Sequence, residues 1–134
     1  MASTEKVRLG KTVLVAEDDD LIRRLISRAL EADGFRVLAA ADGSEAVREF
    51  SANLDEVGCV LLDLTMPTMG GDEALSQLMR IRNDVRVIVM SGHSEMDLAE
   101  RFAGVSLAGV LRKPFDLQTL RAKVDEVMGC AHTA

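Results

Sequence analysis

Short apolar runs alternate along the chain with longer stretches in which apolar residues recur at helical spacing. Five of the runs are too short for helices, and their composition is typical of buried strands. The predicted strands are Thr12–Ala16, Phe35–Ala40, Val60–Leu62, Val85–Met90 and Leu107–Leu111.

An amphipathic helix is predicted after each strand, because apolar residues there recur every three to four positions. Helices are expected from the acidic run at 17–20 to Gly34, after Asp42-Gly43, and over about 72–81, 95–102 and 116–128. The predicted inward faces are Leu21, Ile22, Leu25, Ile26, Ala29 and Leu30; Ala46, Val47 and Phe50; Ala74, Leu75, Leu78 and Met79; Met96, Leu98, Ala99 and Phe102; and Leu117, Leu120, Val124 and Val127. In the first helix Arg23, Arg24 and Arg28 are predicted on the opposite, solvent face.

This fivefold alternation predicts an α/β fold, a doubly wound (βα)5 domain with a five-stranded parallel sheet and helices on both faces. A chain of 134 residues leaves no room for a second domain. We therefore expect a polar leader over 1–10, one domain over 11–128 and a short tail over 129–134.

Composition narrows the class of protein. The net charge of −6 argues against a nucleic-acid surface. No apolar run approaches the roughly 20 residues of a membrane span, and the polar start lacks the apolar core of a signal peptide. Cys59 and Cys130 lack metal-ligand spacing, and Cys59 is expected to be a buried hydrophobe. We expect a cytoplasmic protein without membrane insertion.

Polar residues follow four of the five predicted strands. Glu17 and Asp18 come after the first strand, Asp63 after the third, Ser91 after the fourth and Lys113 after the fifth. Because parallel strands all end at the same edge of a sheet, these side chains should gather there, where ligands of open α/β sheets bind. Each residue alone is weak evidence, but the coincidence is strong.

Structural explanations compete with this interpretation. Asp63 alone would be a turn or helix-capping aspartate, and Asp19 or Asp20 could cap the next helix. The acidic run could also be a solvated corner. If the carboxylates do converge, they favour a hard divalent cation, Mg²⁺ or alternatively Mn²⁺. A carboxylate beside such a cation can act as a nucleophile towards a phosphoryl group and form an aspartyl-phosphate.

Four stretches carry a family resemblance: Val-Leu-Val-Ala-Glu-Asp-Asp, Val-Leu-Leu-Asp-Leu-Thr-Met-Pro-Thr-Met-Gly-Gly, Val-Ile-Val-Met-Ser-Gly and Leu-Arg-Lys-Pro-Phe. In this order and spacing they resemble the response-regulator receiver domain of two-component signalling, over about residues 11–128. The resemblance implies a flavodoxin-like fold. It also implies that Asp63 is the phosphoacceptor, that Asp18 binds Mg²⁺ directly, that Glu17 reaches it through water, and that Thr65 contributes its backbone carbonyl.

The resemblance also implies roles for residues around the phosphoryl group. Ser91 matches the switch hydroxyl, and Lys113 matches the lysine that pairs with the phosphoryl group, followed by a Lys113-Pro114 bond that is usually cis. Three residues depart from the family pattern. Glu17 replaces the commoner Asp, Gly70 replaces an Asp that could cap a helix, and Val110 replaces the aromatic switch residue.

Thr65 and His93 lie two residues after Asp63 and Ser91. We expect both to border the phosphoryl group and to set how fast the aspartyl-phosphate hydrolyses. Alternatively, His93 caps the next helix or faces solvent.

The expected function is therefore a phosphoacceptor receiver that catalyses only its own phosphorylation and dephosphorylation. The resemblance implies that a histidine kinase or histidine phosphotransfer protein supplies the phosphoryl group. It implies output to a protein partner, or by self-dimerisation, through the fourth helix, fifth strand and fifth helix.

A degenerate receiver that only docks proteins is one alternative. A haloacid-dehalogenase-type phosphatase is another, although it needs a second Asp where Thr65 stands. The chain resembles receivers fused to hybrid histidine kinases as well, and Met1 with a polar leader suits a stand-alone protein.

Overall fold

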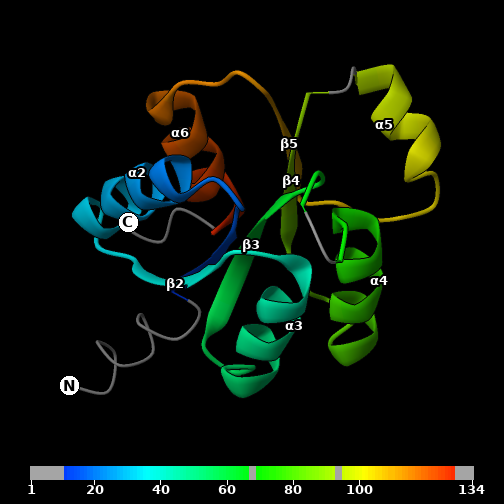
Figure 1. Ribbon diagram of the computed structural model, residues 1–134, viewed down its shortest axis with the longest axis horizontal. Coiled ribbons are helices and arrows are strands. Elements are labelled where there is room, and N and C mark those ends of the chain that lie inside the picture. Colours follow the sequence, from blue (N-terminus) through cyan, green and yellow to red (C-terminus); the bar gives the residue numbers. More distant parts are fainter. Residues whose placement is uncertain (1–10, 67–68, 93–94, 129–134) are drawn as a thin grey trace.

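A computed structural model describes residues 11–66, 69–92 and 95–128 (Figure 1). Its centre is one sheet of five parallel strands in the order β2-β1-β3-β4-β5. The strands are β1 (Thr12–Ala16), β2 (Arg36–Ala40), β3 (Val57–Asp63), β4 (Val87–Ser91) and β5 (Gly109–Arg112). The predicted doubly wound (βα)5 fold is confirmed.

Helices cover both faces of this sheet, as Figure 1 shows. The helices are α2 (Asp20–Ala32), α3 (Gly43–Ala52), α4 (Gly71–Ile81), α5 (Glu95–Arg101) and α6 (Leu117–Val127). Buried residues of α2 and α6 pack in one apolar cluster, and those of α3 and α4 pack in a second cluster on the other face, together with Leu98 of α5.

The strand pleat explains why two cores form. Val13 and Val15 of β1 belong to the cluster under α2 and α6, whereas Leu14 and Ala16 belong to the other cluster. Successive side chains of a strand point to opposite faces, so a strand covered on both sides is apolar at every position. All five residues of β1 are buried accordingly.

The strand boundaries differ from the prediction by a few residues. β2 begins one residue late, because the Phe35 N–H bonds the Leu30 carbonyl at 3.1 Å as part of the end of α2. Gly34 has φ +95° there, which suits the predicted glycine ending of this helix. At its start, Asp19 is the cap, with Oδ1 accepting from Leu21 N and Ile22 N.

Five residues predicted to face inward are exposed, and the prediction was wrong for them. Leu21 is 62% exposed, Leu25 46%, Met96 80% and Leu117 37%, and Ala99 is exposed as well. In α2 only Ile26 and Leu30 are buried, and Ile22 packs against the same cluster while half-buried, so less of the helix is covered than its apolar face suggests. Helical periodicity identifies a face, but it does not say how much of the helix length is covered.

The prediction that Cys59 is a buried hydrophobe is confirmed. Cys59 is a fully buried free thiol. Cys130, the leader over 1–10 and the tail over 129–134 lie outside the described residues. Within the described ranges, no helix has the length and hydropathy to cross a membrane.

Candidate functional site

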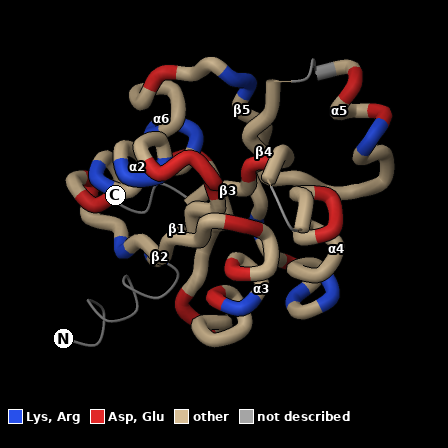
Figure 2. Tube along the Cα trace, viewed as in Figure 1, with Lys and Arg blue, Asp and Glu red and all other residues tan. Residues whose placement is uncertain are grey.

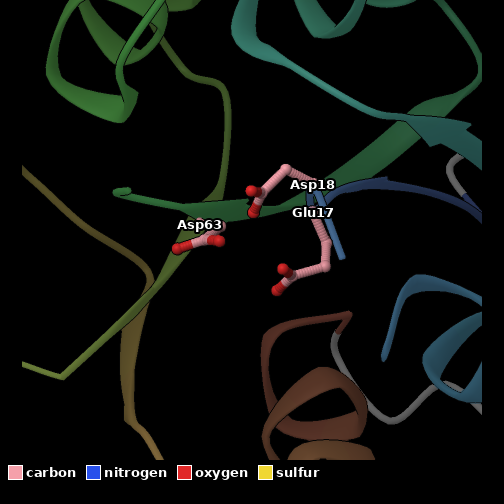
Figure 3. A group of neighbouring side chains, drawn as sticks. All are labelled: Glu17, Asp18 and Asp63. Atoms are coloured by element: carbon pink, nitrogen blue, oxygen red, sulfur yellow. The ribbon is translucent and has the colours of Figure 1, made fainter. Parts of the chain in front are cut away.

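The carboxyl edge of the sheet brings together the carboxylates of three residues from two adjacent strands. Glu17 and Asp18 follow β1, and Asp63 ends β3. One carboxylate oxygen of each lies within 4.8 Å of the others (Figure 3). In Figure 2 the acidic run after β1 forms a continuous red stretch beside the end of β3. The predicted convergence is therefore present.

Glu17 is buried, with 1% of its surface exposed. Its N–H donates to the Ala40 carbonyl at 3.0 Å, and its Oε2 accepts from Asp19 N at 3.1 Å. Burial raises the pKa of Glu17 to about 7; the Asp19 hydrogen bond opposes this shift, Asp63 adds to it, and Lys113 opposes it. The carboxylate is thus costly to ionise until a cation compensates for it.

Asp63 is buried at the last position of β3, where it pairs in register with Met90. Its Oδ1 accepts from Thr65 N at 3.0 Å, and its Oδ2 lies 3.2 Å from the ammonium of Lys113. Asp63 thus stands at the strand end with one hydrogen-bonded oxygen and one ion-paired oxygen. The simple turn explanation accounts for the Thr65 contact but not for the lysine.

Lys113 connects the two buried carboxylates. Its Nζ lies 3.2 Å from Glu17 Oε1 as well as from Asp63 Oδ2. Its backbone N–H donates to the Ser91 carbonyl at 2.7 Å, which ties the end of β5 to β4. Burial lowers the pKa of Lys113, but Asp63 and Glu17 outweigh burial and raise it overall. The Lys113-Pro114 bond is cis, as the family resemblance implies.

Gly71 allows α4 to begin directly against the backbone of Asp63 and Leu64. A Cβ at Gly71 would lie 2.5 Å from Leu64 Cα and 2.8 Å from the Asp63 carbonyl oxygen. The neighbouring Gly70 is the N-cap of α4 and makes no side-chain cap bond, which is consistent with the predicted loss of a cap. The glycine pair therefore has one position required by packing and one open position.

The donor set fits a hard divalent cation. Three carboxylates within 4.8 Å supply the oxygen ligands that Mg²⁺ prefers, and one of the three, Asp18, is exposed to solvent. Exposure on one side leaves room for water and for a phosphoryl oxygen. The chemistry of the cluster is therefore suited to phosphoryl transfer rather than to a closed structural metal site.

Four further residues were predicted to take part in the site or its switch. Ser91 is buried at the end of β4, on the same edge of the sheet. Thr65 is exposed and contributes its N–H to Asp63. Val110 lies within β5 and packs against the α3 and α4 core. His93 lies outside the described residues.

Sequence reasoning missed Arg23, which it assigned to the solvent face. The side chain is only 21% exposed and bonds the Glu17 carbonyl at 2.8 Å. An arginine one turn after a run of acids is a signal that could have suggested this contact, because a helix places that side chain over the preceding turn.

Comparison with known proteins decides the family. The response regulator receiver domain model matches residues 13–125 of the chain. The chain belongs to this family. The receiver is 36% identical over 117 residues to the sensor kinase CckA of Brucella abortus, covering 87% of this chain and 12% of that protein. It is 36% identical over 118 residues to the transcriptional regulatory protein PrrA of Mycobacterium tuberculosis, covering 87% of this chain and 49% of PrrA.

A solved structure supports the fold of the receiver. A chain of the CheX–CheY–BeF3–Mg²⁺ complex from Borrelia burgdorferi superposes with a TM-score of 0.80 and 28% identity, covering 87% of each chain. The receiver spans about half of PrrA and about an eighth of CckA, so it corresponds to a part of those relatives. Family membership and fold are thereby shown.

Proposed function

We propose that this receiver accepts a phosphoryl group on the carboxylate of Asp63 and returns it to water, with Mg²⁺ or Mn²⁺ at the acidic cluster. The observation that carries the proposal is the position of Lys113, whose ammonium lies 3.2 Å from both Asp63 and Glu17. An ammonium held beside the reacting oxygen can neutralise a phosphoryl oxygen as charge develops. The donor we expect is a histidine kinase or a histidine phosphotransfer protein.

The cation would be held by Asp18 and Asp63 directly, by Glu17 through water, and by the backbone carbonyl of Thr65. When bound, it supplies charge neutralisation for the transferring phosphoryl group. The similar Borrelia complex contains Mg²⁺, which supports this assignment. The buried Glu17, with its pKa raised to about 7, gains the compensating charge that the protein alone does not fully provide.

In the transfer step an oxygen of Asp63 attacks the phosphorus of the donor phosphohistidine. The P–O bond to Asp63 forms, the P–N bond breaks, and the imidazole leaves with its electron pair and takes a proton from water. Lys113 and the Ser91 hydroxyl each hold a phosphoryl oxygen. Hydrolysis then removes the phosphoryl group. Water attacks phosphorus, the P–O bond to Asp63 breaks, phosphate leaves, and the carboxylate of Asp63 is free again.

We also propose that Thr65 and His93 border the phosphoryl group and set the rate of hydrolysis by positioning or obstructing the attacking water. The exposed Thr65, one hydrogen bond from Asp63, supports this for the first residue. Phosphoryl lifetimes measured in Thr65→Ala and His93→Ala should differ from wild type. Unchanged lifetimes in both variants would end this idea.

Output is proposed to use α5, β5 and α6, the elements beyond Ser91. Helix α5 is attached by the buried Leu98 and by Arg101, which donates twice to Asp72 Oδ2 of α4, at 2.6 and 3.0 Å. Such an attachment can shift when the site is phosphorylated, which alters binding of a protein partner or of a second copy.

The deciding experiment is mass spectrometry after incubation with acetyl phosphate, with and without Mg²⁺. Asp42 serves as the control, since its Oδ1 caps α3 by accepting from Glu45 N. A gain of one phosphoryl mass that needs Mg²⁺, is lost in Asp63→Asn and persists in Asp42→Asn supports the proposal. A gain that survives in Asp63→Asn would refute the assignment of the acceptor. No gain in wild type from acetyl phosphate or from a phosphorylated histidine phosphotransfer protein would refute phosphoacceptor function.

A docking module without phosphorylation is the second candidate, favoured by Val110 at the position where the family carries an aromatic switch residue. It predicts that wild type fails to bind Mg²⁺. A haloacid-dehalogenase-type phosphatase has less support, because Thr65 stands where that chemistry needs a second Asp. Turnover of a free phosphomonoester would revive it.

A further inference from the structure

Arg23 lies one turn inside α2 and reaches back to the loop that precedes the helix. Its Nη1 donates to the Glu17 carbonyl at 2.8 Å, and its Nη2 donates to Asp20 Oδ1 at 2.5 Å. The side chain is 21% exposed, whereas the neighbouring Arg24 is an exposed residue. The guanidinium is therefore part of the structure of the acidic loop.

The Glu17 carbonyl belongs to the peptide group that leads to Asp18. A peptide group is planar, so a bond that fixes its oxygen also fixes the direction in which the Asp18 Cα follows. Glu17 is already anchored on its other side, because its N–H donates to the Ala40 carbonyl at 3.0 Å. Arg23 thus completes the restraint on the backbone that carries Asp18.

Asp18 is the member of the carboxylate cluster whose position most needs such a restraint. It is exposed, while Glu17 and Asp63 are buried. Carboxylates within 4.8 Å of one another repel, and the exposed one can move away most easily. Ligands that are held in place before binding cost less to order when the cation arrives.

We propose that Arg23 is a positioning residue for the divalent cation, which it serves by holding the Glu17–Asp18 peptide so that Asp18 faces Asp63. The inference rests on the proposed function, since it needs a cation at this cluster. Arg23 contacts Glu17 and Asp20, so it acts through the loop.

A purely electrostatic role and a positioning role of Arg23 predict opposite changes in Mg²⁺ affinity when the side chain is removed. The direction of the change in Kd therefore decides between them. Arg23 places a positive charge near a cation site, so a purely electrostatic role would weaken binding, and removal of the charge would strengthen it. A positioning role requires that removal weakens binding. The guanidinium donates to two acceptors, which a lysine ammonium on a shorter side chain matches only in part.

The test is titration of the full chain with MgCl₂ at pH 8, where Glu17 with its pKa of about 7 is mostly ionised. The chain has no Trp or Tyr, so calorimetry or amide NMR shifts replace intrinsic fluorescence. Arg23→Ala should raise the Kd for Mg²⁺ about tenfold, which corresponds to one charge-assisted hydrogen bond. Arg23→Lys should raise it less, and the matched control Arg24→Ala should stay within about twofold.

Each other outcome overturns the inference. A Kd in Arg23→Ala that equals or falls below that of Arg24→Ala would leave only an electrostatic role. A lowered urea midpoint with an unchanged Kd for the folded protein would leave only a stabilising role. Failure of wild type to bind Mg²⁺ would overturn the proposed cation site and this inference together, and is distinguished from the other outcomes by the wild-type titration alone.

Discussion

The Nζ of Lys113 lies 3.2 Å from Oδ2 of Asp63 at the carboxyl edge of the sheet. The lysine side chain is 30% exposed, and the carboxylate is 3% exposed. The same ammonium lies 3.2 Å from the equally buried Glu17. One ammonium thus lies beside two buried acids from strands that are adjacent in the sheet and distant in the sequence, and it compensates their charge only in part.

Lys113→Ala is expected to lower the unfolding free energy of the metal-free protein by about 2 kcal/mol, because it leaves two buried carboxylates without their cation. Protonation of Glu17 limits the loss. The variant should also accept phosphoryl from acetyl phosphate at least about tenfold more slowly. Urea unfolding in EDTA and time-resolved mass spectrometry measure the two effects.

Lys123→Ala is the matched control, since its side chain is 29% exposed and, among the residues that the structure describes, its ammonium is paired with the exposed Glu126 alone. It should leave the phosphorylation rate unchanged. Equal rates in Lys113→Ala and wild type would contradict the role assigned to the ammonium.

Because the pKa of Glu17 is raised, we expect the stability of the metal-free protein to depend on pH. Burial raises its pKa from 4.5 to about 7, so the folded protein keeps a proton that the unfolded chain releases. This contribution to stability is full below about pH 4.5 and is lost as the pH rises to about 7. Relative to Glu17→Gln, wild type should lose about 2 kcal/mol of unfolding free energy between about pH 5 and 8.

Urea unfolding in EDTA, followed by circular dichroism at several pH values, measures this difference between wild type and Glu17→Gln. Groups shared by both proteins cancel in the comparison. Mg²⁺ added at pH 8 should restore stability to wild type more than to the variant, because it binds the folded state. A difference that does not change with pH would show that Glu17 titrates normally.

The sequence predicted the sheet and the acidic cluster because both follow from one physical rule. Short apolar runs that alternate with amphipathic helices favour the strands of a parallel sheet, and parallel strands end at one edge, so Glu17, Asp63 and Lys113 were expected to be neighbours. Helical periodicity failed for Leu21, because it identifies the apolar face of α2 but not how much of that face is covered. It failed for Arg23 because helical position gives a direction but not the partner to which a long side chain bends.

Substitutions at Gly70 and Gly71, the glycine pair before α4, are expected to have opposite effects on stability. Gly71→Ala should destabilise the fold by about 2 kcal/mol or more, because its Cβ would clash with the Leu64 backbone at 2.5 Å. Gly70→Asp should instead stabilise by about 0.5 kcal/mol, since nothing lies within 4 Å and α4 has no side-chain cap. Thermal unfolding of both variants compares them directly.

The displaced backbone in Gly71→Ala belongs to Asp63 and Leu64, so this variant should also accept phosphoryl more slowly. Gly70→Ala, which adds a Cβ in open space, controls for the loss of a glycine as such. Wild-type stability in Gly71→Ala would show that the loop adjusts freely.

From the position of Val110 we expect that the output surface can be altered without changing the phosphorylation of Asp63. It borders a hollow of about 350 Å³ between α5 and β5, together with Leu98, Ala99, Phe102, Val105 and Leu107. A larger apolar side chain has room to enter, so Val110→Phe should keep or raise the unfolding free energy by up to about 1 kcal/mol. Overpacking would instead cost about 1–3 kcal/mol, which would contradict an accessible hollow.

Phosphorylation of Val110→Phe should stay within about twofold of wild type, because residue 110 is not among those that hold Asp63. The amide NMR shifts that accompany phosphorylation should change in α5, since the new ring would lie between that helix and the sheet. Val110→Ala is the companion variant: it should lower stability by about 1 kcal/mol through lost packing and leave phosphoryl uptake unchanged.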